Sequence, residues 1–107
     1  MKINIMKESI PYITDVTIAG TTFQFEFTYN SYDKRVYVTL YDIENNLIYP
    51  NEPILFGIPL WFNKLVDEKG NFNKKYPQKY IIPNTLDRKV VKINYENIDK
   101  IELLVEE

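Results

Sequence analysis

Acidic side chains are the only residues of this sequence whose number and spacing could support general acid–base chemistry. They are spread over the first half of the chain and could approach one another across a hairpin: Asp15, Glu26, Asp33, Asp42 and Glu44. Two carboxylates a few ångströms apart can hydrolyse a glycosidic bond. These five residues, however, alternate with apolar residues or fall in polar turns, and no local catalytic motif accompanies them. We therefore expect no enzymatic activity and no catalytic residue.

The other reactive and metal-binding residue types are absent or isolated. The chain has no His and no Cys, which removes the commonest general base and the usual zinc ligands. Ser9 and Ser31 do not stand in a nucleophile-elbow motif, and the three glycines are too far apart for a phosphate-binding loop. Residues 42–46 lack the glycine and the distal Glu of a calcium loop. We expect no cofactor and no metal site.

The elements that carry these side chains are predicted to be β-strands, because apolar and polar residues alternate with a period of two. Alternation is clearest over residues 22–29 and recurs over residues 12–18. The two segments are joined at Gly20, which predicts a β-hairpin. A third strand is expected over residues 35–42 after a polar turn, so the domain should begin with a three-strand antiparallel meander.

The second half of the chain is less regular. The apolar run 54–62 contains Gly57 and Pro59, which predicts either one buried strand that bends at a corner or two interrupted strands. A long loop rich in Asn and Lys is expected around residues 63–79. Short strands are expected at 80–82, 90–93 and 98–105. The pattern predicts one all-β domain, a small antiparallel barrel or sandwich over residues 1–107, in which residues 1–10 could form a flexible N-terminal arm.

The amino-acid composition limits the kinds of molecule that this chain is expected to bind. With 13 basic and 15 acidic residues the formal net charge is −2, which disfavours general binding of nucleic acid. The absence of Cys suits assembly in a reducing cytoplasm. The first seven residues have no continuous apolar stretch, so we expect no signal peptide, and no run is long enough to cross a membrane. Nine Tyr residues offer large contact areas with polar tips, which suits contacts with other proteins.

Two binding alternatives depend on aromatic side chains. The stripe formed by Phe23, Phe25 and Phe27 could stack on the bases of a single-stranded nucleic acid, but the same alternation is typical of the core face of a sheet. Trp61 could form a platform for a sugar, but its place inside an apolar run favours burial.

Several segments resemble the cyanophage-type baseplate plug family of small tail proteins. The resemblance is carried by the Gly20-Thr21 turn, the aromatic strand that ends at Asn30, the Tyr37–Asp42 strand and the segment Pro53–Leu60. It implies a non-enzymatic virion protein, a plug or connector in the hub of a tail baseplate that is assembled in the host cytoplasm. Its partners would be neighbouring baseplate, hub or tail-tube proteins, in a symmetric multi-copy assembly such as a trimer or hexamer.

Two surfaces are predicted to make these contacts, because exposed aromatic residues in loops and on sheets often bind partners. One is a tyrosine face on the third strand, and the other is the long loop with aromatic anchors and basic rim residues. The residues concerned are Tyr37 and Tyr41 on the strand, and Phe72, Lys74, Lys75, Tyr76 and Tyr80 in or beside the loop.

Overall fold

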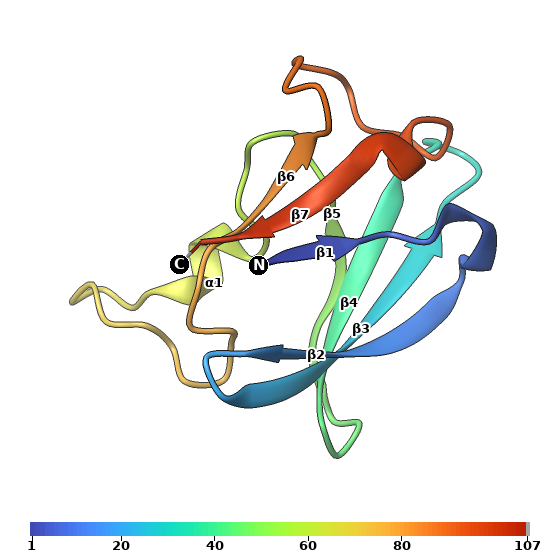
Figure 1. The fold of residues 1–107 in the computed structure, drawn as a ribbon. Coiled ribbons are helices and arrows are strands. Elements are labelled where there is room, and N and C mark those ends of the chain that lie inside the picture. Colours follow the sequence, from blue (N-terminus) through green and yellow to red (C-terminus); the bar gives the residue numbers. More distant parts are fainter. Residues whose placement is uncertain (107) are drawn as a thin grey trace.

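The computed structural model describes residues 1–106, and in this part of the chain two antiparallel sheets pack face to face (Figure 1). The larger sheet has the order β2-β3-β4-β5, formed by β2 (Tyr12–Ile18), β3 (Thr21–Tyr29), β4 (Val36–Asp42) and β5 (Leu47–Pro53). The smaller sheet has the order β1-β7-β6, formed by β1 (Lys2–Asn4), β7 (Ile101–Val105) and β6 (Ile81–Thr85). Three short helices are η1 (Lys7–Ser9), α1 (Phe62–Leu65) and η2 (Ile98–Lys100). The predicted small all-β fold is confirmed, as a sandwich rather than a closed barrel.

The hairpin β2–β3 forms where the alternation of the sequence is strongest. Ala19 and Gly20 connect the strands with φ angles of 51° and 81°, the backbone of a two-residue type I′ turn. The register places Val16 opposite Phe23, and the odd-numbered Phe residues of β3 point into the core. Because β4 and β5 follow in order, the predicted three-strand meander continues into a fourth strand.

The N-terminal segment, for which the sequence suggested a flexible arm, contains β1. This strand pairs antiparallel with β7, with Ile3 opposite Leu103, and both Ile3 and Ile5 are buried. The two termini of the described chain therefore lie close together at one end of the smaller sheet (Figure 1).

The predicted strand over residues 54–62 is wrong, because extended pairing ends at Pro53. The segment 54–60 instead crosses from one sheet to the other. The Ile54 amide donates to the Val36 carbonyl at 3.1 Å, and the Gly57 amide donates to the Pro83 carbonyl at 2.9 Å. The segment therefore turns the corner that Gly57 and Pro59 predicted, but it closes one side of the sandwich as an irregular connection.

Two further segments differ from the prediction in smaller ways. Residues 90–93 form no strand, although Ile93 is buried. The C-terminal strand begins at Ile101, because residues 98–100 form the single turn of η2. None of the helices in residues 1–106 is long and apolar enough to span a membrane.

The core lies between the two sheets and takes up both aromatic groups that suggested ligand binding. Phe25 and Phe27 are fully buried, and Phe23 nearly so, which leaves no exposed stripe on which nucleic-acid bases could stack. Trp61 is 2% exposed and meets Phe25 edge-on, with ring centroids 5.4 Å apart. Its predicted burial is confirmed, and it offers no platform for a sugar.

Candidate interaction surfaces

Three of the five acidic residues named in the sequence analysis accept hydrogen bonds in turns or on the face of the larger sheet, namely Glu26, Asp33 and Asp42. The carboxylate of Asp42 accepts the backbone amides of Glu44 and Asn46 at 3.0 and 2.8 Å. These hydrogen bonds, led by that from Asn46, lower the pKa of Asp42. Within residues 1–106 no cluster of three or more acidic side chains could hold a metal ion.

The outer face of the larger sheet carries the tyrosines predicted on β4. The Tyr41 hydroxyl donates to Glu26 Oε1 at 3.1 Å, and the Tyr37 hydroxyl donates to Asp33. The latter hydrogen bond lowers the pKa of Asp33 and raises the pKa of Tyr37. Both tyrosines are half-buried and hydrogen-bonded to a carboxylate, so the face that they form is polar.

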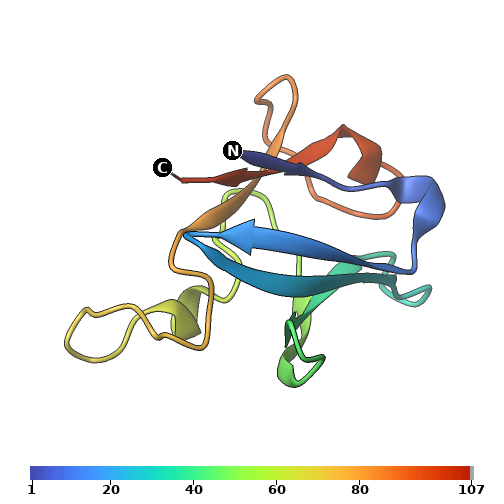
Figure 2. The same ribbon diagram turned by 60° about the horizontal axis from the view of Figure 1, so that its bottom comes forward.

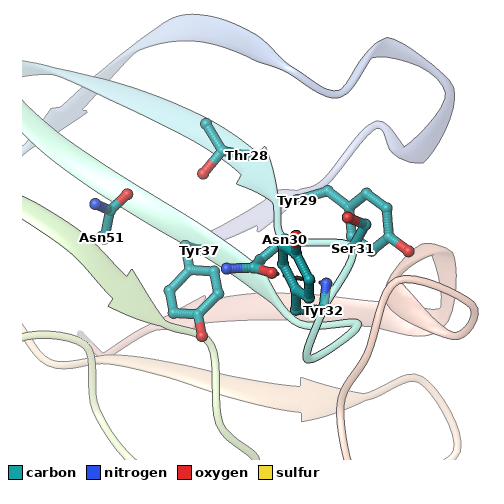
Figure 3. Close-up of a pocket in the computed structure, with 7 residues that line it drawn as sticks. All are labelled: Thr28, Tyr29, Asn30, Ser31, Tyr32, Tyr37 and Asn51. Atoms are coloured by element: carbon teal, nitrogen blue, oxygen red, sulfur yellow. Dashed lines mark hydrogen bonds between the residues drawn. The ribbon is translucent and has the colours of Figure 1, made fainter.

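A tyrosine pocket lies where this face meets the turn between β3 and β4 (Figure 3). Its volume is about 640 Å³, and it is lined by Thr28, Tyr29, Asn30, Ser31, Tyr32, Tyr37 and Asn51. Tyr32 is 97% exposed, although its backbone amide is fixed by Asn30 Oδ1 at 2.8 Å. The ring of Tyr29 packs at a tilt against the ring of Tyr95, with ring centroids 4.4 Å apart. One side of the pocket is therefore supported by an aromatic contact.

The lysine-rich segment 63–79 is a loop with its own internal structure. Asp67 Oδ1 accepts the amides of Lys69 and Asn71, and Val66 pairs with Phe72 as an isolated bridge. The amide of Asn73 returns to the Leu65 carbonyl at 2.7 Å. These contacts hold residues 65–73 together in a loop that projects from the sandwich beside α1 (Figure 2).

The structure separates the predicted loop residues into two groups. Tyr76 is 7% exposed and packs in the core, although it also lines the groove described below. Phe72 is 38% exposed, and its ring lies 5.9 Å from that of the half-buried Tyr80. Lys74 and Lys75 are exposed and line a groove of about 610 Å³.

This groove joins the loop to the opposite end of the larger sheet from the tyrosine pocket. Its other wall is formed by the turn between β4 and β5, where Ile43 and Leu47 are exposed. Apolar side chains beside two lysines form a surface that could bind a partially acidic partner. The tyrosine pocket and this groove therefore lie at the two ends of β3 and β4.

One polar contact fixes the start of the loop. The Trp61 amide donates to Glu52 Oε2 at 2.6 Å, and Trp61 itself has a left-handed backbone with φ of 56°. Burial raises the pKa of Glu52, while the hydrogen bond from Trp61 acts in the opposite direction. The indole Nε1 is buried and has no hydrogen-bond partner among the described residues.

Sequence reasoning missed Tyr29, Tyr32 and Asn51 as surface residues. The Asn, Ser and Asp residues of segment 30–34 predict a polar turn. A tyrosine in the middle of a polar turn has no core to enter, and this was the signal that could have identified Tyr32.

A small two-sheet β-domain, with tyrosine- and lysine-lined surfaces, is the class of protein that this geometry defines. The family model described as Cyanophage baseplate Pam3 plug gp18 matches residues 1–105. The chain therefore belongs to this family of phage baseplate plugs, which confirms the resemblance found in the sequence and supports a structural role in the baseplate. No curated protein matches the chain.

Proposed function

We propose that this chain is a non-enzymatic plug or connector in the hub of a phage tail or tail-like particle, and that it acts through protein–protein contacts. Membership of the plug family supports the location in the baseplate. The observation that carries the contact mechanism is Tyr32, which is 97% exposed on a backbone fixed by hydrogen bonds. A tyrosine side chain has only two rotatable χ angles, so an exposed tyrosine on a hydrogen-bonded turn can enter a partner's pocket at a low cost in conformational entropy.

The neighbouring subunits would be baseplate, hub or tail-tube proteins, and the symmetry of the particle would repeat the chain as a trimer or hexamer. Two separate surfaces at opposite ends of β3 and β4 suit a subunit that touches two different neighbours. The tyrosine pocket would bind one neighbour, and the groove beside Lys74 and Lys75 would bind the other.

Mass spectrometry of purified particles tests the proposal. We expect the chain at a fixed stoichiometry that is a small multiple of three, whereas absence from assembled particles would refute a structural role. Replacing Tyr32 with Ala should reduce incorporation roughly tenfold or more, as for a central tyrosine of an interface. Val90→Ala is the matched control, because Val90 is also highly exposed, at 82%, but lies in a different loop.

A further inference from the structure

The four edges of the two sheets are not equally protected against further strand pairing. The free edge of β6 is covered by the segment 54–60, through the amides of Gly57 and Leu60, each 2.9 Å from a β6 carbonyl. The free edge of β5 contains Pro50 and Pro53, which have no amide hydrogen to donate. The edges of β1 and β2 have neither kind of protection.

The free edge of β2 presents a row of backbone groups to solvent. In the type I′ hairpin, Ile18 and Thr21 flank the turn and exchange backbone hydrogen bonds. Since bonded and non-bonded pairs alternate in an antiparallel ladder, the N–H and C=O groups of Ile13, Asp15 and Thr17 point away from β3. Outside the ladder, no backbone hydrogen bond of these three residues occurs within residues 1–106.

The same reasoning applies to β1. The Val105 amide donates to the Met1 carbonyl at 2.8 Å, which makes this a bonded pair, and Ile3 with Leu103 is then the next bonded pair. The backbone groups of Lys2 and Asn4 therefore point away from β7, toward the open side of the sandwich.

These two open edges border one groove. Residues of β1 and of β2 line its two walls, and Figure 2 shows the two strands one above the other on the open side of the sandwich. The groove has a volume of about 450 Å³ and is lined by Lys2 and Asn4 of β1, by Asp15 and Thr17 of β2, and by the apolar Ile3 and Val16. Thus the sandwich is closed by the segment 54–60 on one side and remains open between β1 and β2 on the other.

We propose that the groove between β1 and β2 accepts an extended strand from a neighbouring baseplate protein, which pairs with the outward backbone groups of β2. The proposal rests on the proposed function, in that the chain works through contacts with other proteins. The strand would alternate apolar side chains over Ile3 and Val16 with polar ones facing outward. A Lys or Arg on its outward side would lie near Asp15, which is exposed and forms no ion pair within residues 1–106.

The position of Asp15 favours a foreign strand over a second copy of β2. Antiparallel pairing of two β2 edges must join the outward residues Ile13, Asp15 and Thr17. The register that uses all three pairs Ile13 with Thr17 and sets Asp15 opposite Asp15 of the partner copy. Like charges directly opposite each other destabilise a sheet.

Substitutions at Asp15 test the proposal by competition between variant and wild-type chains for incorporation into particles. Asp15→Pro removes an outward amide, which edge strands tolerate, and Asp15→Ala is the matched control that removes the same charge but keeps the amide. We expect the Pro variant to be incorporated about tenfold less than the Ala variant, the loss expected for one or two hydrogen bonds. Asp15→Lys leaves the backbone unchanged and should also compete poorly, because its charge would repel the basic residue of the strand.

The melting temperatures of the purified variants show whether each still folds. Folded Pro and Lys variants that compete as well as the wild type would overturn the strand-addition proposal and leave the proposed function standing, whereas absence of the wild type from particles would overturn both. Sedimentation of the wild-type chain alone as a dimer, with Asp15→Pro as a monomer, would identify a second copy as the occupant and overturn the foreign strand.

Discussion

Replacing Tyr76 with Ala should destabilise the fold far more than replacing Phe72 with Ala, although both aromatic residues belong to the same lysine-rich loop. Tyr76 is 7% exposed and Phe72 is 38% exposed. Truncation of a large buried aromatic side chain to Ala costs about 3–5 kcal/mol, and the position of Tyr76 at the margin of the core places it at about 3 kcal/mol. Phe72 would lose mainly its contact with Tyr80, an aromatic pair of a kind worth about 1 kcal/mol.

These free energies correspond to clearly different melting temperatures. For a domain of about one hundred residues, 1 kcal/mol shifts the melting temperature by about 4–8 °C. We therefore expect a loss of roughly 12 °C or more for Tyr76→Ala and roughly 4–8 °C for Phe72→Ala. Thermal unfolding followed by far-ultraviolet circular dichroism, with urea titrations of the same samples, measures both.

The control is Tyr76→Phe, which keeps the ring in the core and should change the free energy of unfolding by less than Tyr76→Ala. Equal losses for the two Ala variants, or a melting temperature of Tyr76→Ala within about 3 °C of the wild type, would show that the loop does not pack as the structure has it. The reasoning that assigns Tyr76 to the core and Phe72 to the surface would then be refuted.

Three further outcomes follow from the polar contacts and the buried stripe. Burial raises the pKa of Glu52 in the folded state. The neutral carboxyl group therefore stabilises the fold fully below the unfolded-state pKa, and this stabilisation is lost as pH rises through the folded-state pKa. Glu52→Gln should therefore gain stability over the wild type at pH 7 but not at pH 4, as measured by urea unfolding. Asp42 has a lowered pKa, so Asp42→Ala should lower the melting temperature at pH 7, and the two proteins should converge as pH falls through the folded pKa of Asp42. A low-salt filter-binding titration with single-stranded oligo-dT should show no binding, since the Phe stripe is buried; tight, salt-sensitive binding would contradict this.

The elements that the sequence predicted correctly are those whose side-chain pattern is set locally. The centre of strand β3 alternates Phe with polar residues, and a one-residue slip would expose every Phe, so its register follows from the pattern. The run 90–93 contains three β-branched residues, which are typical of strands, but it forms no strand. The alternation of residues 90–93 could not show that these residues lack a pairing partner. In the smaller sheet, both sides of β7 are already taken, by β1 and by β6.

The surfaces were only partly predictable for the same reason. Tyr37 and Tyr41 follow from the alternation of β4, which places them opposite the core side chains. Tyr76 stands in a polar, lysine-rich stretch, and nothing in its neighbours indicates that the loop returns to the core. That return depends on non-local contacts, such as the hydrogen bond from the Asn73 amide to the Leu65 carbonyl.

The distribution of protected and open edges also bears on how this chain avoids uncontrolled association with other copies of itself. An unprotected edge strand is a template for pairing, and a head-to-tail contact that does not close produces fibres. Here β5 and β6 are blocked by prolines and by the segment 54–60, which leaves β2 as the one long open edge within residues 1–106. Asp15 at the centre of that edge disfavours pairing with another β2 but does not hinder a strand with a basic residue. By this reasoning, β2 would stay unpaired between copies of the chain and remain available to the foreign strand that we propose.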